Sequence, residues 1–353
     1  MEESGESLTW PPVSVIMPVL NEERHLADSV AEVLSQDYPG PVEVILALGP
    51  SRDRTDEVAA QVEATDARVK CVRNPSGRTP NGLNAAIRAS RHDIIARVDG
   101  HGVLSPGYLR RAVETLQRTG AANVGGLMVA AGKTGFEQAV ARAYGSRVGL
   151  GGGSFHVGGP EGPADTVYLG VFRRKVLEQL GGFDEYYHRA QDWELNLRIR
   201  QAGGVVWFSP DLSVTYRPRS SVTDLAHQFF RTGQWRREVI KRYPDTVALR
   251  YVAAPVATAV IAAGSVAGLA GVAGPDWLLW GWLAPTGYLG GVLAASLAEG
   301  RDLSARGRAW LPLVLSTMHI SWGTGFLFGT GGVPVRRRAR PTAPRPWRTE
   351  PSR

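Results

Sequence analysis

The stretch DIIARVDGHG at residues 93–102 runs from a short apolar strand directly into Asp99, Gly100 and His101. Side chains at the end of a buried strand can leave the sheet and meet a ligand. A carboxylate two residues from an imidazole therefore suggests a metal-nucleotide site. Taken in isolation, an Asp-Gly-His sequence is more simply a strand followed by a solvated turn. The order of the elements around this stretch decides between the two interpretations.

Residues 13–245 alternate between short apolar runs and amphipathic segments. This alternation predicts an α/β fold with a mainly parallel, Rossmann-like sheet and helices on both faces. Such sheets bind ligands at the carboxyl ends of their strands, where Pro18, residues 51–55 and Asp99 all fall. The expected strands are 13–17, 42–48, 69–72 and 94–98, and the expected helices are 22–35, 55–64 and 82–89.

The net charge of +7 is concentrated in residues 333–353, a Pro- and Arg-rich segment with seven Arg and one Glu. The rest of the chain is close to neutral, which argues against a basic body that follows nucleic-acid phosphates. We expect this tail to be disordered. Cys71 is the only cysteine among 353 residues, so an internal disulfide is excluded, and it is expected to be a small buried hydrophobe.

Two long apolar runs in the C-terminal third of the chain, residues 251–273 and 277–298, contain no charged side chain. At about 1.5 Å per helical residue, each can cross a hydrocarbon core of roughly 30 Å. A pair of buried core helices is the alternative. The short segment between the runs predicts a tight helical hairpin. The N-terminus has acids and no apolar core, so a cleavable export signal is not expected and the preceding domain should face the cytosol.

Basic residues flank both ends of this hairpin, whereas the turn has only Asp276, so both ends are predicted to be cytosolic. A third apolar stretch at 309–329 contains Pro312 and His319. Crossing would place the Arg-rich tail outside, against the positive-inside tendency. An interfacial or re-entrant helix is therefore favoured over a third span, with the tail inside and attracted to anionic lipid.

Several ordered motifs resemble those of the inverting family 2 glycosyltransferases of GT-A fold. Within that family the chain is similar to the bacterial succinoglycan-type enzymes, whose members often end in membrane segments. The resemblance covers about residues 12–245. The motifs are VSVIMPVLNEERHL from residue 13, SRDRT from residue 51, GLNAAIRASRHDIIARVDGHG from residue 82, DTVYLGVFRRKVLEQLGGFDE from residue 165 and QDWELNLRIRQAG from residue 191.

The resemblance implies a nucleotide-sugar donor, a divalent cation and an Asp base that activates an acceptor hydroxyl. Asp99 and His101 occupy the metal-site positions, and the histidine, where many relatives have a second Asp, should suit Mn²⁺ at least as well as Mg²⁺. Asp192 matches the base, and a helix-capping Asp is the alternative. Relatives usually carry an acid where this chain has Gln191.

The resemblance also implies a set of donor-binding residues on several elements. One departure concerns donor selectivity: relatives commonly end the second strand with an acid, whereas this chain has Leu48 there, so uridine is not assumed. The helix that resembles the post-catalytic motif is alternatively a basic membrane-surface helix. The implied donor-site residues are Pro18, Asn21 and Glu22 in the first turn, Asp53 in the second, Arg78 for the diphosphate, then Asn84 and Asp99, and Gln228, Arg231 and Trp235 in the post-catalytic motif.

These features predict a membrane-anchored, metal-dependent hexosyltransferase that adds one sugar to a lipid-linked, cell-envelope or exopolysaccharide acceptor. A non-catalytic membrane scaffold that binds nucleotide or glycan is the alternative. A dinucleotide-dependent oxidoreductase is disfavoured because no G-x-G-x-x-G opens the first helix. The glycine-rich segment 149–162 is either a substrate lid or a plain linker. The expected domains are a flexible N-terminus at 1–11, the cytoplasmic catalytic domain at 12–245, a multi-pass cell-membrane region at 246–332 and the tail at 333–353.

Overall fold

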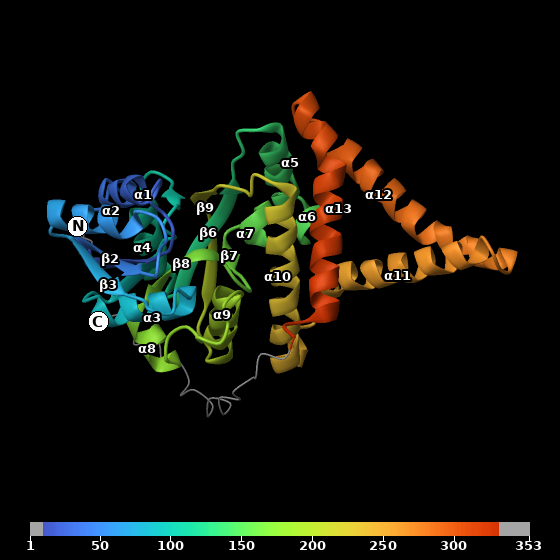
Figure 1. Ribbon diagram of the computed structural model, residues 1–353. Helices are drawn as coiled ribbons and strands as arrows, with labels where there is room; N and C mark the ends of the chain where they lie inside the picture. Colours follow the sequence, from blue (N-terminus) through green and yellow to red (C-terminus); the bar gives the residue numbers. More distant parts are fainter. Residues whose placement is uncertain (1–9, 332–353) are drawn as a thin grey trace, which may run out of the picture. The chain divides into compact units, whose positions relative to one another are not determined.

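Two units divide the part of the chain that the computed structural model describes, residues 10–331 (Figure 1). The first unit holds residues 10–128 and 159–215, and the second holds 129–158 and 216–331. The division runs through the segment 12–245 that the sequence predicts as one domain. The predicted Arg-rich tail and most of the predicted flexible N-terminus lie outside the described residues.

The first unit is built on a nine-stranded mixed sheet in which four consecutive strands are parallel. The central strand β1 (Val13–Val19) lies between β2 (Val42–Leu48) and β4 (Ile94–Arg97), and β3 (Val69–Arg73) pairs with β2 at the edge. The strand order therefore reverses at β1, which creates a topological switch point beside the ends of β1 and β4, the place where sheets of this kind bind ligands. The connecting helices are α1 (Leu26–Leu34), α2 (Thr55–Thr65) and α3 (Thr79–Ala89).

Beyond β4 the sheet turns antiparallel, which the alternating pattern of the sequence does not predict. β8 (Tyr168–Arg173) pairs antiparallel with β4, and β6 (Asn123–Ala130) pairs antiparallel with β8. The fold class is α/β as expected, with the parallel order restricted to its first half. The remaining elements are β5 (Val103–Leu104), α4 (Tyr108–Thr119), β7 (Gly162–Pro163), α8 (Arg174–Leu180), α9 (Gln191–Gln201) and β9 (Val206–Tyr216).

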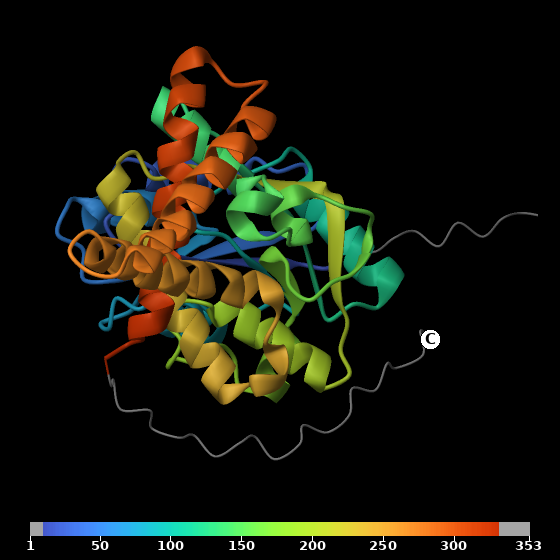
Figure 2. The ribbon, with the colours of Figure 1, turned by 90° about the vertical axis from the view of Figure 1, so that its right-hand side faces the viewer.

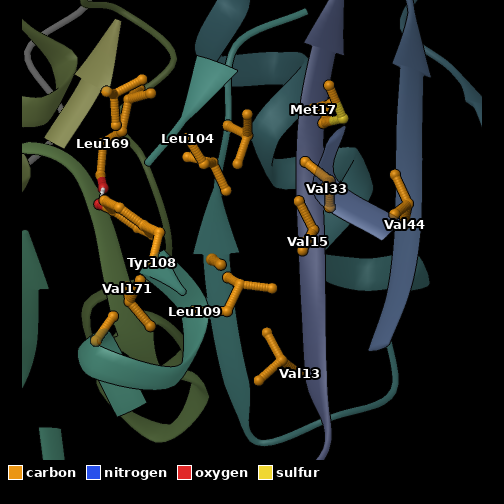
Figure 3. Packing of buried hydrophobic residues seen from close by; sticks show 14 of the residues in the cluster. Val13, Val15, Met17, Val33, Val44, Leu104, Tyr108, Leu109, Leu169 and Val171 are labelled. Atoms are coloured by element: carbon orange, nitrogen blue, oxygen red, sulfur yellow. Dashed lines mark hydrogen bonds between the residues drawn. The ribbon is translucent and has the colours of Figure 1, made fainter. Parts of the chain in front are cut away.

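Apolar side chains of the parallel strands and of the helices that cover them form the core of this unit (Figure 3). Val13, Val15 and Met17 alternate along β1 on one face and are fully buried. Tyr108 is also fully buried, and its hydroxyl donates to the carbonyl of Leu169 at 3.0 Å, so the ring fills the core without leaving a polar atom unsatisfied. This core holds the strand ends rigidly in place.

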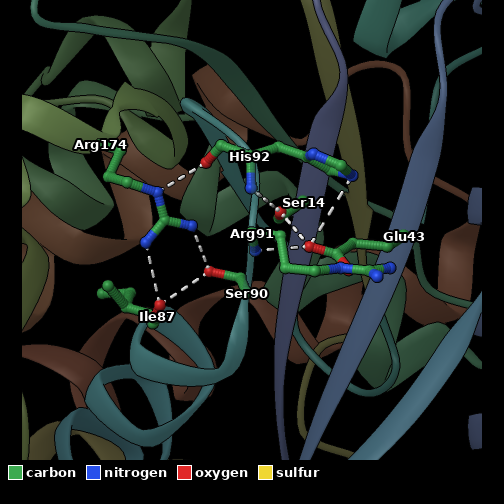
Figure 4. A network of polar contacts seen from close by, with 7 residues as sticks. All are labelled: Ser14, Glu43, Ile87, Ser90, Arg91, His92 and Arg174. Carbon is green, nitrogen blue, oxygen red and sulfur yellow. Dashed lines mark hydrogen bonds and ion pairs between the residues drawn. The ribbon is translucent and has the colours of Figure 1, made fainter.

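At the opposite end of β1 from the switch point, a polar network surrounds the buried carboxylate of Glu43 (Figure 4). Ser14 donates to Glu43 at 2.6 Å, the backbone N–H of Arg91 donates at 2.7 Å, and the Arg91 side chain donates at 3.0 Å. Burial raises the pKa of Glu43, but these hydrogen bonds outweigh it and hold the pKa below its usual value. The network ties the start of β4 to β1 and β2.

The second unit carries the long helices. Helix α10 (Val222–Arg242) and helix α13 (Ala305–Phe328) pack closely, since a Cβ at Gly233 would meet the Trp322 carbonyl and one at Gly325 would meet the Phe230 carbonyl. The other elements of this unit are α5 (Gly135–Tyr144), α6 (Arg147–Leu150), α7 (Ser154–Val157), η1 (Pro244–Thr246), α11 (Leu249–Gly271), η2 (Asp276–Trp282) and α12 (Leu283–Glu299).

Three helices of the second unit are long and apolar enough to cross a membrane: α11, η2 with α12, and α13. The predicted hairpin corresponds to the first two, which are joined at a tight turn and extend away from α13 (Figures 1 and 2). In the most apolar 18-residue stretch of α13, 33% is buried by other parts of the protein, whereas the corresponding stretches of α11 and η2–α12 are only 11% and 6% buried. The third apolar segment is therefore the one that its own protein shields most.

We expect Glu43→Gln to lower the free energy of unfolding at pH 7 by about 2 kcal/mol, the usual worth of charge-assisted hydrogen bonds. A carboxyl with a depressed folded-state pKa stabilises above its unfolded pKa, and this stabilisation is lost as the pH falls through the folded value. Thermal melts in detergent from pH 8 to pH 3 measure the difference. The gap between wild type and variant should be largest near neutral pH and close on acidification.

Glu114→Gln is the matched control, because Glu114 forms only a half-exposed pair with Arg110 on the surface of α4. Such pairs contribute roughly 0–1 kcal/mol, so the control should melt close to wild type throughout. Equal melting of Glu43→Gln and wild type at pH 7 would contradict this account of the network.

Candidate active site

The turns that follow β1 and β2 are joined by hydrogen bonds into one surface at the switch point. The backbone N–H of Asn21 donates to Ser51 at 3.0 Å, and the side-chain oxygen of Asn21 accepts from the backbone of Arg52 at 2.8 Å. The backbone N–H of Glu22 donates to Thr55 at 2.7 Å. Pro18 lies half-buried in β1 just before this turn. The two predicted donor-binding turns therefore lie side by side.

Asp53 is the centre of the second turn. One carboxylate oxygen accepts from the hydroxyl of Thr55 at 2.5 Å and from its backbone N–H at 3.1 Å, and the other accepts from the backbone of Glu23 at 3.3 Å. The Thr55 hydroxyl is the largest reason that the pKa of Asp53 lies below its usual value. These bonds shape the turn itself. A direct contact between Asp53 and a donor stays a prediction.

Arg78, the N-cap of α3, and Asn84, in the middle of that helix, lie in different environments. Arg78 is exposed, as a residue that binds a soluble diphosphate needs to be. Asn84 is buried, and its side-chain amide donates to the Phe183 carbonyl at 2.8 Å while its oxygen accepts from the Phe183 N–H at 2.9 Å. The amide thus holds the loop after α8 in place. A donor contact of either residue stays a prediction.

Asp99 and His101 follow β4 at the switch point, as the sequence predicts. Nδ1 of His101 lies 2.7 Å from a carboxylate oxygen of Glu22 in the neighbouring turn. If Nδ1 carries the proton, it donates to Glu22 and the lone pair lies on Nε2, the arrangement typical of metal-binding histidines. Gly100 between them is buried, and a Cβ there would lie 3.1 Å from Cγ of Glu22, so the turn packs directly on the Glu22 side chain.

These two side chains can supply only part of a cation site. Within residues 10–331, no group of three or more His, Cys, Asp or Glu side chains gathers in a geometry that could hold a metal ion. Mg²⁺ and similar cations are commonly held by one or two protein carboxylates together with substrate phosphates and water. Asp99 and His101 fit a site of this type, in which the oxygens of a diphosphate complete the coordination of the cation.

Asp192 is the second residue of α9, and its side chain does not cap the helix. The N-cap position is Ala190, and no side chain accepts a hydrogen bond there. Instead, the Asp192 carboxylate forms an ion pair with the guanidinium of Arg97. Burial raises the pKa of Asp192 above its usual value, with Arg97 acting in the opposite direction. The helix-capping alternative therefore lacks the hydrogen bond that would define it.

Arg97, the last residue of β4, joins the two predicted functional carboxylates and was not predicted from the sequence. One of its terminal nitrogens pairs with Asp192, and the other donates to Asp99 at 2.9 Å. Its side chain is only 4% exposed, against 23% for Asp99 and 29% for Asp192. A signal was present: an arginine inside an apolar strand, two residues before Asp99, points to the same face of the strand as that aspartate.

Helix α9 is anchored by a buried ion pair one turn beyond Asp192. Arg198 donates to Glu194 at 2.8 Å and also to the carbonyls of Leu180 and Gly182. Glu194 is fully buried and Arg198 nearly so. Breaking such a pair leaves an uncompensated buried charge, which is strongly unfavourable. The position of Asp192 is therefore set by contacts that hold the whole helix to the loop after α8.

The predicted post-catalytic residues lie on α10 in the second unit. Gln228 accepts from Arg219 at 3.0 Å and donates to the hydroxyl of Tyr216 at 3.1 Å. Arg231 is exposed and Trp235 is buried on the same helix. The helix is amphipathic, as the sequence predicts, and a role of these residues toward a donor stays a prediction.

The glycine-rich segment is more ordered than a plain linker. It contains α7 and the end of α6, and its glycines allow close backbone contacts: a Cβ at Gly149 would lie 1.9 Å from the Ala143 carbonyl. Gly151 has φ +75° and lies against Arg250. His156 is largely enclosed, and burial lowers its pKa to about 4. Closure of this segment over a substrate stays a prediction.

Residues 14–181 match the family Glycosyl transferase family 2. The chain is similar to the succinoglycan biosynthesis protein ExoA of Rhizobium meliloti, with 28% identity over 329 residues, which covers 92% of this chain and 96% of the relative. It is also similar to a dolichyl N-acetyl-α-D-glucosaminyl phosphate 3-β-D-2,3-diacetamido-2,3-dideoxy-β-D-glucuronosyltransferase of Methanococcus voltae, with 24% identity over 65% of this chain and 74% of the relative.

Among solved structures, the chain is similar to the mannosyltransferase PcManGT from Pyrobaculum calidifontis in complex with GDP-Man and Mn²⁺. The TM-score is 0.62 with 20% sequence identity, and the match covers 91% of this chain and 88% of that chain. At this identity the likeness shows the fold, which is the GT-A arrangement expected from the motifs.

Ala190, immediately before α9, has φ +62°, a left-handed conformation that glycine adopts without cost and alanine does not. We expect Ala190→Gly to relieve this strain and raise the free energy of unfolding by up to about 1 kcal/mol. Ala60→Gly on the exposed face of α2 is the matched control and should lower it by about 1 kcal/mol. Chemical denaturation measures both. Equal destabilisation by the two variants would rule out strain at Ala190.

Proposed function

We propose that this protein, a glycosyltransferase that carries a family 2 domain, transfers a sugar from a nucleotide-sugar to a polysaccharide or lipid-linked acceptor with inversion at the anomeric carbon. The observation that carries the proposal is the guanidinium of Arg97, which brings Asp99 and Asp192 to one point at the carboxyl end of β4. The first is the predicted cation ligand and the second the predicted base. Parallel sheets bind their ligands at this edge.

In the proposed reaction, an acceptor hydroxyl oxygen forms a bond to the anomeric carbon as the bond from that carbon to the diphosphate oxygen breaks. The hydroxyl proton passes to the Asp192 carboxylate, and the products are the glycosylated acceptor and a nucleoside diphosphate. Asp99 and His101 would hold a divalent cation, whose charge neutralises the leaving diphosphate. The solved neighbour, in complex with GDP-Man and Mn²⁺, supports a cation and a nucleotide-sugar as ligands of this fold.

Donor selectivity rests on the surface formed by the first two turns. Leu48 ends β2 where relatives commonly have an acid, and the next residue, Gly49, packs against Leu20 and the backbone of Gly77. The surface that would meet the nucleobase of the donor thus consists of apolar atoms and backbone near the end of β2, with Asn21 and Ser51 at its side. We propose that nucleobase selectivity uses backbone and amide groups, so both uridine and guanosine donors belong in the test.

The decisive experiment incubates the purified full chain with a panel of radiolabelled nucleotide-sugars, Mn²⁺ and a membrane lipid extract. Wild type should incorporate label in a metal-dependent manner. Asp192→Asn should lose on the order of 10²–10⁴-fold in rate, the contribution typical of a general base, while donor binding is largely kept. Asp211→Asn, an exposed residue of β9, is the control and should behave as wild type. Absence of incorporation across the panel would favour the scaffold, and turnover by Asp192→Asn would remove it as the base.

We further propose that the membrane hairpin enters and leaves on the cytosolic side, with the third apolar helix at the interface. Helix α13 packs along α10, which carries Arg231, Arg237 and Lys241, and a helix this basic belongs at the membrane surface. Arg301 and Arg308 beyond the hairpin support the same orientation.

Reporter fusions check this topology. A fusion at Asp276, in the turn of the hairpin, should report a non-cytosolic location, whereas fusions at Asp245 and after Arg340 should report the cytosol. An external reporter after Arg340 would show that α13 crosses the membrane, and a cytosolic reporter at Asp276 would show that the hairpin does not.

A further inference from the structure

Arg97 occupies a buried strand position, where an apolar side chain would normally pack in the core. All four residues of β4 are buried, and the neighbours Ile94, Ile95 and Ala96 are apolar. Placing a cation there is strongly unfavourable unless it is paired and hydrogen-bonded. The two terminal nitrogens of Arg97 pair with the carboxylates of Asp192 and Asp99. The arginine is therefore explained by the two carboxylates rather than by the core.

The geometry of the guanidinium explains why an arginine serves here. Its two terminal nitrogens diverge at a fixed angle within one plane, so a carboxylate bound to each is held at a set separation. Without a cation between them, two carboxylates this close would repel each other. Because Arg97 is much less exposed than either aspartate, it supports both from the sheet side and leaves their open sides toward solvent.

We propose that Arg97 is a positioning residue that holds the base Asp192 and the cation ligand Asp99 in register, and that its charge limits how tightly the site binds a divalent cation. This inference rests on the proposed function. Arg97 uses Oδ1 of Asp99, so Oδ2 is the oxygen that remains for a cation. A fixed positive charge beside that oxygen weakens cation binding, which favours release of the cation with the diphosphate product.

Arg97→Met, Arg97→Gln and Arg97→Lys of the full chain test the proposal. In the Met and Gln variants, kcat should fall by about 100-fold because the base is no longer held, with the donor KM changed by less than about threefold. Lysine keeps the charge but cannot bridge two carboxylates with a rigid fork, so it should restore only part of kcat. A lysine variant with full kcat, or a methionine variant with unchanged kcat, would overturn the positioning role.

Mn²⁺ binding to the protein with a saturating nucleoside diphosphate (GDP or UDP, each tested) and no acceptor gives a second readout that does not depend on turnover. The free-ion paramagnetic resonance signal, titrated with Mn²⁺ at constant diphosphate and compared with a protein-free blank, should show that Arg97→Met and Arg97→Gln bind about tenfold tighter than wild type, because a neighbouring positive charge is gone. Arg97→Lys should bind as wild type does. A merely structural arginine predicts the opposite, since a disordered site binds the cation more weakly, and that result would overturn the proposal.

A double variant separates positioning of the base from general damage. If Arg97 acts through Asp192, then Arg97→Met combined with Asp192→Asn should be no slower than Asp192→Asn alone. Multiplying losses would contradict the proposal. Should wild type itself transfer no sugar, the proposed function fails, and the Mn²⁺ titration still decides whether Arg97 limits cation binding. If Arg97→Met does not fold, as judged by its thermal melt, the lysine variant decides by its kcat and its unchanged Mn²⁺ affinity.

Discussion

One buried guanidinium connects the carboxylates of Asp99 and Asp192, which lie 93 residues apart in the chain, and much of the first unit serves to make that contact possible. A charge this deep is tolerable only if its partners cannot drift away. Asp99 is held by the turn directly after β4, where Gly102 donates to the Asp99 carbonyl at 2.8 Å. Asp192 is held by α9, whose position depends on a second buried ion pair, Glu194 with Arg198. Two rigid supports therefore meet at Arg97.

The sheet topology determines why these supports meet where they do. Because β1 is paired in parallel with both β2 and β4, the turns after all three strands open on the same edge. The antiparallel strand β8 continues the sheet past β4 and leads into α8 and then α9. The parallel half thus provides the donor-side turns and the cation ligands, whereas the antiparallel half delivers the candidate base to the same edge.

The sequence predicted what depends on local pattern and left out what depends on tertiary pairing. Strands β1 to β4 were anticipated within a few residues because apolar β-branched runs and amphipathic helices alternate there. Helix α1 begins at Leu26 rather than near residue 22. The backbone N–H groups of residues 21–23 instead donate hydrogen bonds to side chains of residues 51–55, in the turn after β2. The antiparallel pairing of β8 with β4 and the contact between Glu22 and His101 involve partners about 80 residues apart, which no periodicity reveals.

Backbone conformation gives independent evidence of where the structure is strained. Among residues 10–331, the non-glycine residues with positive φ are Asn21, Leu169 and Ala190. The first lies in the donor-side turn and the third immediately before α9. Such conformations persist only where surrounding structure over-determines them, and they concentrate at functional sites. Asn21 is held by Ser51 and Arg52, and Ala190 by the anchored helix that follows it. Strain at Asn21 and Ala190 is what a site organised for chemistry, rather than for stability, is expected to retain.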